Sequence, residues 1–263
     1  MKERLLSIFN STYKENREEI DQLLDRLNYS VEELKEGVLH YTFGIGDDSR
    51  KNELYRESLM PLVLHFHNLI KTSYHQERQK TAYEYLEKAQ AKKFIDIGYG
   101  APGSHISDYL QDYKDSEATL ADQDKNAEKF SKMLFEISHP SLTNRVKYLL
   151  HNMNSYNPPK GFDTYLMLDS IEHCDDPTKY LHKLVETSPE ANFIFSIPIC
   201  SKKSLDKMHF YEWITTFDAD NWLSDAGLEV LESKEIFPKS DTDYFTEFIE
   251  GGFFNYFVLC RKR

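Results

Sequence analysis

The sequence predicts an α/β protein with a mostly parallel sheet, on three observations. From residue 92 onward, short apolar runs alternate with amphipathic helical patterns, as in a parallel sheet with crossover helices. The first of these runs, 92–97, leads directly into a glycine-rich loop. Two apolar runs near the end of the chain, 229–236 and 253–260, follow one another with no helical pattern between them. Such a succession predicts an antiparallel pair of strands that closes the sheet.

The glycine-rich loop points to a nucleotide-type ligand. Gly98, Gly100 and Gly103 have G-x-G-x-x-G spacing, and a helix is predicted to begin near Ser104. A tight turn from strand to helix needs residues without a Cβ atom, and it lets a ligand approach backbone N–H groups. The chain has ten glycines, and three of them lie here. The loop therefore predicts a Rossmann-type site, although an ordinary turn between a strand and a helix could also use glycine.

Two acidic residues refine this prediction. Asp96 lies two residues before the first glycine, where a dinucleotide-binding strand is normally apolar. Asp122 follows the next predicted strand, 118–121. An acid at the end of that strand can accept hydrogen bonds from both hydroxyls of a ribose.

The acid-x-Gly-x-Gly form of residues 96–100 resembles motif I of the class I S-adenosylmethionine-dependent methyltransferases. The resemblance covers residues 89–263 and implies a Rossmann-like sheet with an antiparallel C-terminal hairpin. It divides the chain into an N-terminal helical extension or lid, 1–90, and a domain that binds S-adenosylmethionine, 91–263. The cofactor-binding residues that it implies are Asp96, Gly98, Tyr99, Gly100, Gly103, Asp122, Gln123, Asn152 and Asp169. For Asn152, contact with the adenine amino group and simple turn formation are alternatives.

The stretch 168–177 resembles the leu-x-x-x-glu-his-x-x-x-pro pattern of many small-molecule methyltransferases. The catalytic residues that we expect are Glu172, His173 and His209, because a hydroxyl acceptor must lose a proton and histidine titrates near neutrality. Methyl transfer to the oxygen or nitrogen of a small molecule is the predicted reaction. In an alternative interpretation, Glu172 and His173 only cap the helix that follows them.

A second enzyme class shares part of this pattern. Small-RNA 3′-terminal 2′-O-methyltransferases carry an acid-x-x-Glu-His motif and a later His-x-Phe-Glu-Trp motif that bind a divalent metal. Asp169, Glu172 and His173 resemble the first motif, and residues 209–213 resemble the second. Whether a metal binds here is left open, and the metal-free interpretation is favoured because a net charge of −12 suits RNA poorly. A third hypothesis is a non-catalytic binding protein on a degenerate fold.

Composition sets the remaining expectations. The three cysteines are widely spaced, which fits a reducing compartment, and the first residues do not form a secretory signal. We expect a cytoplasmic protein with a small-molecule substrate as its partner and without a nucleic acid or a membrane. The sequence does not predict the oligomeric state.

Residues 1–90 read as helices. A capping box at Ser30 and Glu33 predicts the start of one helix, and Gly37 is predicted to end it. Five residues of this region are candidates for the lining of a substrate pocket, with packing against the core domain as the alternative: Tyr41, Phe43, His65, His67 and Tyr74.

Overall fold

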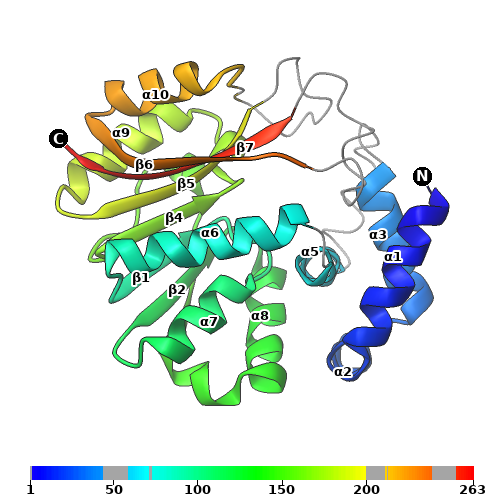
Figure 1. The fold of residues 1–263 in the computed structure, drawn as a ribbon. Coiled ribbons are helices and arrows are strands. Elements are labelled where there is room, and N and C mark those ends of the chain that lie inside the picture. The colour runs from blue at the N-terminus through cyan, green and yellow to red at the C-terminus, as the bar shows by residue number, and fades with distance from the viewer. Residues whose placement is uncertain (1, 44–58, 71–72, 200–210, 212, 239–252) are drawn as a thin grey trace.

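The structure of the chain is a computed structural model. It describes residues 2–43, 59–70, 73–199, 211, 213–238 and 253–263. Figure 1 shows a twisted sheet with helices on both faces and a group of N-terminal helices at one side.

The described helices and strands have the following bounds. In the N-terminal region they are α1 (Lys2–Glu15), α2 (Arg17–Leu27), α3 (Val31–Phe43), α5 (Met60–Leu69) and α6 (Ser73–Ala89). The first half of the sheet domain contains β1 (Lys93–Ile97), α7 (Ser104–Asp112), β2 (Glu117–Asp122), α8 (Lys125–Ser138), η1 (Pro140–Arg145), β3 (Val146–Leu150) and η2 (Met153–Ser155). The second half contains β4 (Thr164–Leu168), η3 (Ile171–His173), α9 (Pro177–Thr187), β5 (Asn192–Ile199), α10 (Thr216–Asp225), β6 (Leu228–Ile236) and β7 (Phe254–Lys262).

The sheet confirms the predicted architecture. Its strand order is β3-β2-β1-β4-β5-β7-β6. β1 to β5 are parallel, and β7 is antiparallel to both β5 and β6. The last strand is thus inserted between its two predecessors, which gives the antiparallel hairpin that the two final apolar runs predicted.

The strands bury side chains on both faces, as expected for a sheet that helices cover on each side. On one face, Ile95 and Ile97 of β1 pack in a cluster with α9 and α10. On the other face, Phe94 of β1 packs in a cluster with α6, α7 and α8. Because side chains alternate along a strand, Asp96 belongs to the same face as Phe94. This register directs the acid of the glycine motif toward α6 and α7.

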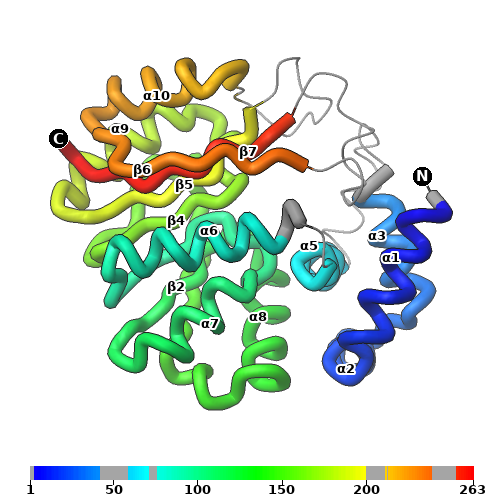
Figure 2. Tube along the Cα trace, in the orientation of Figure 1, coloured from blue at the N-terminus to red at the C-terminus, as the bar shows by residue number. Residues whose placement is uncertain are grey.

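The N-terminal helices form a third apolar cluster, in which α1, α2, α3 and α5 pack against α8. Phe66 of α5 and Phe130 of α8 are both buried there, and Ala101 of the glycine-rich loop belongs to the same cluster. Figures 1 and 2 show α5 lying between the sheet domain and the other N-terminal helices. The N-terminal helices are therefore in contact with the predicted cofactor loop.

Local predictions in this region had mixed outcomes. Ser30 and Glu33 form the predicted capping box, in which each backbone N–H is bound by the other residue's side chain. The prediction that Gly37 ends the helix is wrong, since α3 continues to Phe43. Burial of Leu34 and Val38 on one side of α3 outweighs the intrinsic cost of glycine in a helix, which is about 1 kcal/mol.

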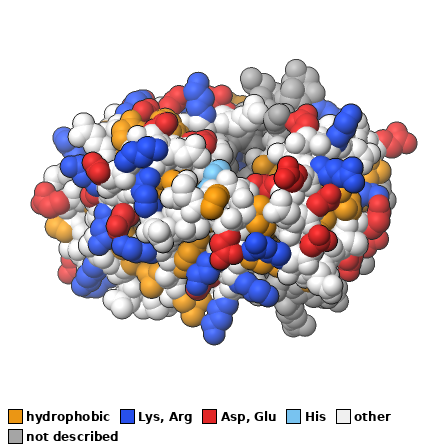
Figure 3. All heavy atoms as spheres, turned by 90° about the horizontal axis from the view of Figure 1, so that it is seen from below, with side chains coloured by type: hydrophobic (Ala, Val, Ile, Leu, Met, Phe, Trp, Pro, Cys, Tyr) orange, Lys and Arg blue, Asp and Glu red, His pale blue; other side chains and the backbone are white. Residues whose placement is uncertain are grey.

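Two further observations concern the apolar character of the helices and the distribution of charge on the surface. Among the described helices, none is both long and apolar enough to cross a bilayer. On the face drawn in Figure 3, acidic and basic side chains are interspersed.

Candidate cofactor and acceptor site

The glycine-rich loop follows β1 and lies against the segment that follows β4. Gly98 has a φ of +74°, and a Cβ atom there would lie 2.5 Å from the Cβ of Ser170. Ser170 is buried, and its Oγ donates a hydrogen bond to the carbonyl of Ile97 at 2.7 Å. Only glycine fits both the backbone conformation and this close approach. The absence of a side chain at Gly98 thus lets the loop lie directly against Ser170.

Asp122 connects the loop to the carboxyl end of β2. Its Oδ2 accepts the backbone N–H of Gly100 at 2.9 Å, and its Oδ1 accepts that of Asp124 at the same distance. Burial raises the pKa of the Asp122 carboxyl, and the backbone hydrogen bonds act in the opposite direction. Each carboxylate oxygen can accept more than one hydrogen bond, so Asp122 keeps acceptor capacity for a ribose.

Asp96 is almost completely buried beneath the loop. Its side chain is 4% exposed, and its Oδ2 lies 3.6 Å from Nε2 of His105, the second residue of α7, which is equally buried. The Oδ1 atom of Asp96 has no hydrogen-bond partner among the described residues. A buried acceptor in this state costs free energy unless a donor is supplied, and a ligand ammonium group can supply one.

Sequence reasoning missed the residue that caps α7. Gly103 precedes this helix and has no side chain, so the first turn is capped by Gln79 of α6. The Oε1 of Gln79 accepts the backbone N–H of His105 at 3.3 Å and contacts its Nδ1 at 2.8 Å. A Cβ atom on Gly103 would overlap the Gln79 amide. No local signal could reveal this contact, because α6 lies before the glycine motif.

Asp169, at the end of β4, is held by three side chains. Arg78 of α6 forms an ion pair with its Oδ2. Ser196 and Asn255 each donate a hydrogen bond to its Oδ1 at 2.5 Å. Asp169 has a φ of +51°, a conformation that residues with a side chain rarely adopt. Strained backbone of this kind clusters at functional sites, and here these contacts hold it.

Glu172 and His173 form the short helix η3 beside this cluster. Glu172 is 1% exposed and His173 is half-buried. The backbone N–H of Tyr211 donates to the carbonyl of Glu172 at 3.4 Å. The helix that follows is capped by Asp176, whose side chain accepts the N–H of Lys179. The alternative interpretation of Glu172 and His173 as a helix cap is therefore wrong.

The other predicted residues have varied surroundings. His209 lies outside the described residues. Asn152 is exposed and accepts the N–H of Asn154 at 2.8 Å, as a turn-forming residue does. Tyr99 lies near Ser131 of α8, whose Oγ is 3.3 Å from its hydroxyl, and burial raises the pKa of this phenol. Gln123 is exposed beside Asp122.

Two of the N-terminal aromatic candidates are core residues. His65 and His67 are buried, and His65 pairs with Glu19 of α2 at 2.8 Å. The ring of Tyr41 packs on that of His67, with 5.0 Å between centroids. The side chains of Phe43 and Tyr74 lie outside the described residues.

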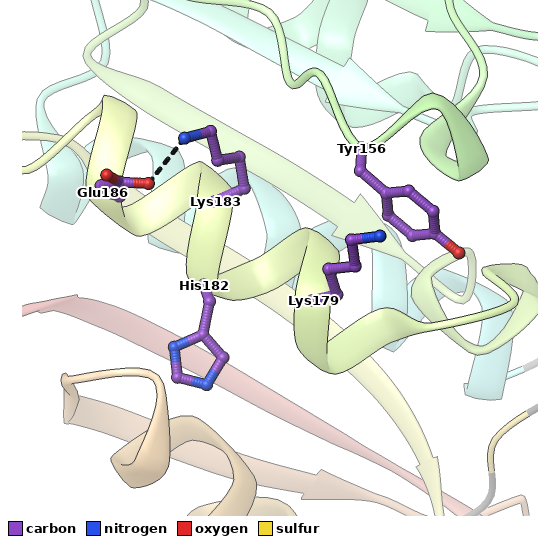
Figure 4. Close-up of a pocket in the computed structure, with 5 residues that line it drawn as sticks. All are labelled: Tyr156, Lys179, His182, Lys183 and Glu186. Carbon is purple, nitrogen blue, oxygen red and sulfur yellow. Dashed lines mark hydrogen bonds and ion pairs between the residues drawn. The ribbon is translucent and has the colours of Figure 1, made fainter.

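A hollow on the surface of α9 does not coincide with these residues. Its lining consists of Tyr156, Lys179, His182, Lys183 and Glu186 (Figure 4). Lys179 lies over the ring of Tyr156, and Lys183 pairs with Glu186. None of the five is a predicted site residue, so we assign no role in methyl transfer to this hollow.

The strand order and the glycine-rich loop define a class of protein. The order β3-β2-β1-β4-β5-β7-β6, with the antiparallel β7 inserted last, is the sheet of the class I methyltransferases. The chain has this fold, as its sequence predicted.

Comparisons with known proteins agree with this assignment. An (S)-coclaurine N-methyltransferase of Thalictrum flavum subsp. glaucum is 26% identical over 160 residues, which cover 58% of this chain and 42% of that protein. The match thus spans less than half the length of this curated relative. No protein-family model matches the chain.

Solved structures with the same fold include enzymes of different substrate classes. The mitomycin 7-O-methyltransferase MmcR is 16% identical, with a TM-score of 0.56 over 80% of this chain and 60% of that one. PigF, solved with SAH, is 14% identical, with a TM-score of 0.57 over 92% and 70%. A small RNA methyltransferase is 17% identical, with a TM-score of 0.55 over 72% and 25%. At these identities the likeness establishes the fold alone.

Proposed function

We propose that the chain is an S-adenosylmethionine-dependent methyltransferase that acts on an oxygen or nitrogen of a small molecule. The observation that carries this proposal is the hydrogen bond between Gly100 and Asp122, which joins the glycine-rich loop to the acid after β2. A ribose held by Asp122 would lie beside the backbone of the loop at Gly100. The names of the N-methyltransferase relative and of the O-methyltransferase MmcR support the same reaction class.

The residues present fit this cofactor. Gly98 and Gly100 place no side chain at two positions of the loop, and Asp122 offers acceptors for the ribose. Asp96 offers the ammonium group a buried oxygen that has no hydrogen-bond partner among the described residues. When bound, S-adenosylmethionine supplies an electrophilic methyl group. The chain must then orient the acceptor in line with that group, exclude water and remove a proton from a hydroxyl acceptor. We assign proton removal to His173 or His209, with Glu172 as the neighbouring carboxylate.

A metal-dependent RNA methyltransferase is the second candidate, because its predicted motif residues Asp169, Glu172 and His173 lie close together in sequence after β4. The structure gives a reason to disfavour it. The Asp169 carboxylate is already bound by Arg78, Ser196 and Asn255, so a divalent cation would have to displace a guanidinium. These three contacts of the Asp169 carboxylate argue against a metal ion at this position.

The test has two stages. In the first, calorimetry measures binding of S-adenosylmethionine and S-adenosylhomocysteine, with NAD as the control ligand. Binding of NAD but of neither methionine derivative would overturn the proposal. In the second, pooled small acceptors and RNA with a free 3′ end are offered with and without a chelator. We expect methylation of a small acceptor that survives chelation. Chelator-sensitive methylation of RNA ends would favour the second candidate instead.

A further inference from the structure

Asp96 is the acid of the glycine motif, but its buried neighbour His105 lies outside that motif and was not predicted as a site residue. The question is which ring nitrogen of His105 carries a proton, because that decides whether the ring attracts or repels the Asp96 carboxylate.

A series of hydrogen bonds fixes the orientation of the amide that contacts the ring. The backbone carbonyl of Ala101 can only accept, so the Nδ2 of Asn68 is its donor, at 3.4 Å. The Oδ1 of Asn68 then accepts from the Nε2 of Gln79 at 3.3 Å, which leaves the Oε1 of Gln79 facing His105. The backbone N–H of His105 can only donate, and it donates to this same Oε1 at 3.3 Å. Both ends of the series agree on the orientation of Gln79.

The protonation of the ring follows from this orientation. The Nδ1 of His105 lies 2.8 Å from an oxygen that accepts, so Nδ1 carries a proton. In a neutral ring Nε2 would then be a bare acceptor, 3.6 Å from the carboxylate oxygen of Asp96, with both side chains 4% exposed. Nε2 has no hydrogen-bond partner among the described residues, and two buried acceptors facing one another are unfavourable. A proton on Nε2 turns the contact into an ion pair, at a distance longer than a hydrogen bond. The ring thus lies between two polar side chains, with Gln79 at Nδ1 and Asp96 at Nε2.

We propose that His105 is a positioning residue of the cofactor site: with both nitrogens protonated, it holds Oδ2 of Asp96 and leaves Oδ1 to the ammonium group of the methyl donor. This inference rests on the proposed function for the identity of the ligand. The proposal also assigns α5 and α6 to the cofactor site. Asn68 of α5 orients the amide of Gln79, and Gln79 of α6 orients the ring of His105.

Two substitutions of His105 separate positioning from packing. His105→Gln places an amide N–H near the position of Nε2 and can still donate to Asp96, whereas the shorter His105→Asn reaches only as far as Nδ1. His182→Gln on α9 is the control, since His182 is exposed and belongs to no predicted site. We expect His105→Asn to lose at least tenfold in affinity for S-adenosylhomocysteine, and His105→Gln to remain within a few-fold of wild type.

The comparison of the two variants supplies a readout that a packing role would not change, because only a positioning role requires a donor at the place of Nε2. Equal affinities of His105→Asn and His105→Gln for S-adenosylhomocysteine would overturn the inference.

A measurement without ligand keeps the inference independent of the proposed function. Long-range ¹H–¹⁵N NMR at neutral pH, with the His105 signals assigned by their loss in His105→Gln, reports the protonation of each ring nitrogen. Two protonated nitrogens are expected. A bare Nε2 would refute the positioning role even if the cofactor binds, and a doubly protonated ring in a protein that binds no methionine derivative would refute only the proposed function.

Discussion

The backbone N–H of Gly100 donates a hydrogen bond to Oδ2 of Asp122 at 2.9 Å, across the carboxyl ends of β1 and β2. Gly100 has a φ of +57°, and a Cβ atom there would lie 2.7 Å from Leu64 of α5. The same loop residue therefore contacts the acid predicted to hold the ribose and a helix of the N-terminal region. The carboxylate that we propose as the ribose ligand is thus also a brace for the loop.

The first prediction concerns the charge of Asp122. In Asp122→Asn one carboxylate oxygen becomes an amide that donates, so the side chain can no longer accept the N–H groups of both Gly100 and Asp124. We expect affinity for S-adenosylhomocysteine to fall at least tenfold, or about 1.4 kcal/mol, measured by calorimetry. Glu117→Gln is the control, because it removes a carboxylate from the amino end of the same strand, opposite to Asp122. Unchanged affinity in Asp122→Asn would show that the Asp122 carboxylate does not bind the cofactor.

The second prediction concerns the titration of the same residue. Because burial raises the pKa of Asp122, its protonated form accumulates at a higher pH than for an exposed aspartate. A protonated carboxyl accepts hydrogen bonds poorly, so cofactor affinity should fall as the pH is lowered through that raised pKa. Calorimetry from neutral to mildly acidic pH should show this fall in wild type and a weaker one in Asp122→Asn, with circular dichroism to verify folding. Identical pH profiles of wild type and Asp122→Asn would show that another group causes the loss of affinity at low pH.

The third prediction compares two glycines whose φ angles are both in the left-handed region, where a residue with a side chain would be strained. Gly98 and Gly227 both have a positive φ, of +74° and +82°, but a Cβ atom would meet Ser170 at Gly98 and nothing within 4 Å at Gly227. Gly227→Ala should cost only the backbone term, roughly 1 to 2 kcal/mol of unfolding free energy. Gly98→Ala should cost more, and it should also abolish measurable cofactor binding because the loop must move. Urea unfolding and calorimetry test both statements, and equal effects of the two substitutions would contradict the close approach to Ser170.

Much of the fold could be predicted from the sequence because its signals are local. The apolar runs, the spacing of Gly98, Gly100 and Gly103, and the succession of the last two strands indicate the sheet and the loop without knowledge of distant contacts. The capping box at Ser30 was readable for the same reason. The prediction that Gly37 ends its helix was wrong, because the preference of glycine for helix ends was weaker than the burial of its neighbours.

The surroundings of the site residues could not be read in this way. Arg78 reaches Asp169 and Gln79 reaches His105, in each case from a helix that precedes the glycine motif. Such pairs depend on how α6 packs on the sheet, and no spacing rule connects residues so far apart. The role of Asp169 illustrates the difference: its place after β4 was predicted from the sequence, but its ion pair was not.

The fourth prediction concerns stability in acid. Burial lowers the pKa of His67 from 6.5 to about 3. The unfolded chain therefore takes up a proton below pH 6.5 while the folded chain does not, so this residue destabilises the fold as the pH falls from 6.5 toward about 3. The loss is about 1.4 kcal/mol per pH unit over most of that window. Urea unfolding at several pH values should give a shallower dependence for His67→Leu and an unchanged one for His182→Gln. Equal slopes for wild type and His67→Leu would show that His67 is protonated when folded.

The last prediction concerns the N-terminal helices, which we propose act as a lid over the acceptor site. They already contact the cofactor loop: Leu64 lies against Gly100, and Asn68 donates to the carbonyl of Ala101. A ligand that orders the loop should therefore also order α5.

Hydrogen exchange with and without S-adenosylhomocysteine tests this coupling. We expect slower exchange in peptides from α5 and from the first turns of α6 when the ligand is bound, with peptides from α9 unchanged as the internal reference. Asn68→Ala should reduce the protection of α5 while leaving that of the strand β2 in place, because it cuts the contact with Ala101 but not the hydrogen bond between Gly100 and Asp122. Equal exchange of α5 in the free and bound protein would contradict the lid and leave these helices a fixed structural role.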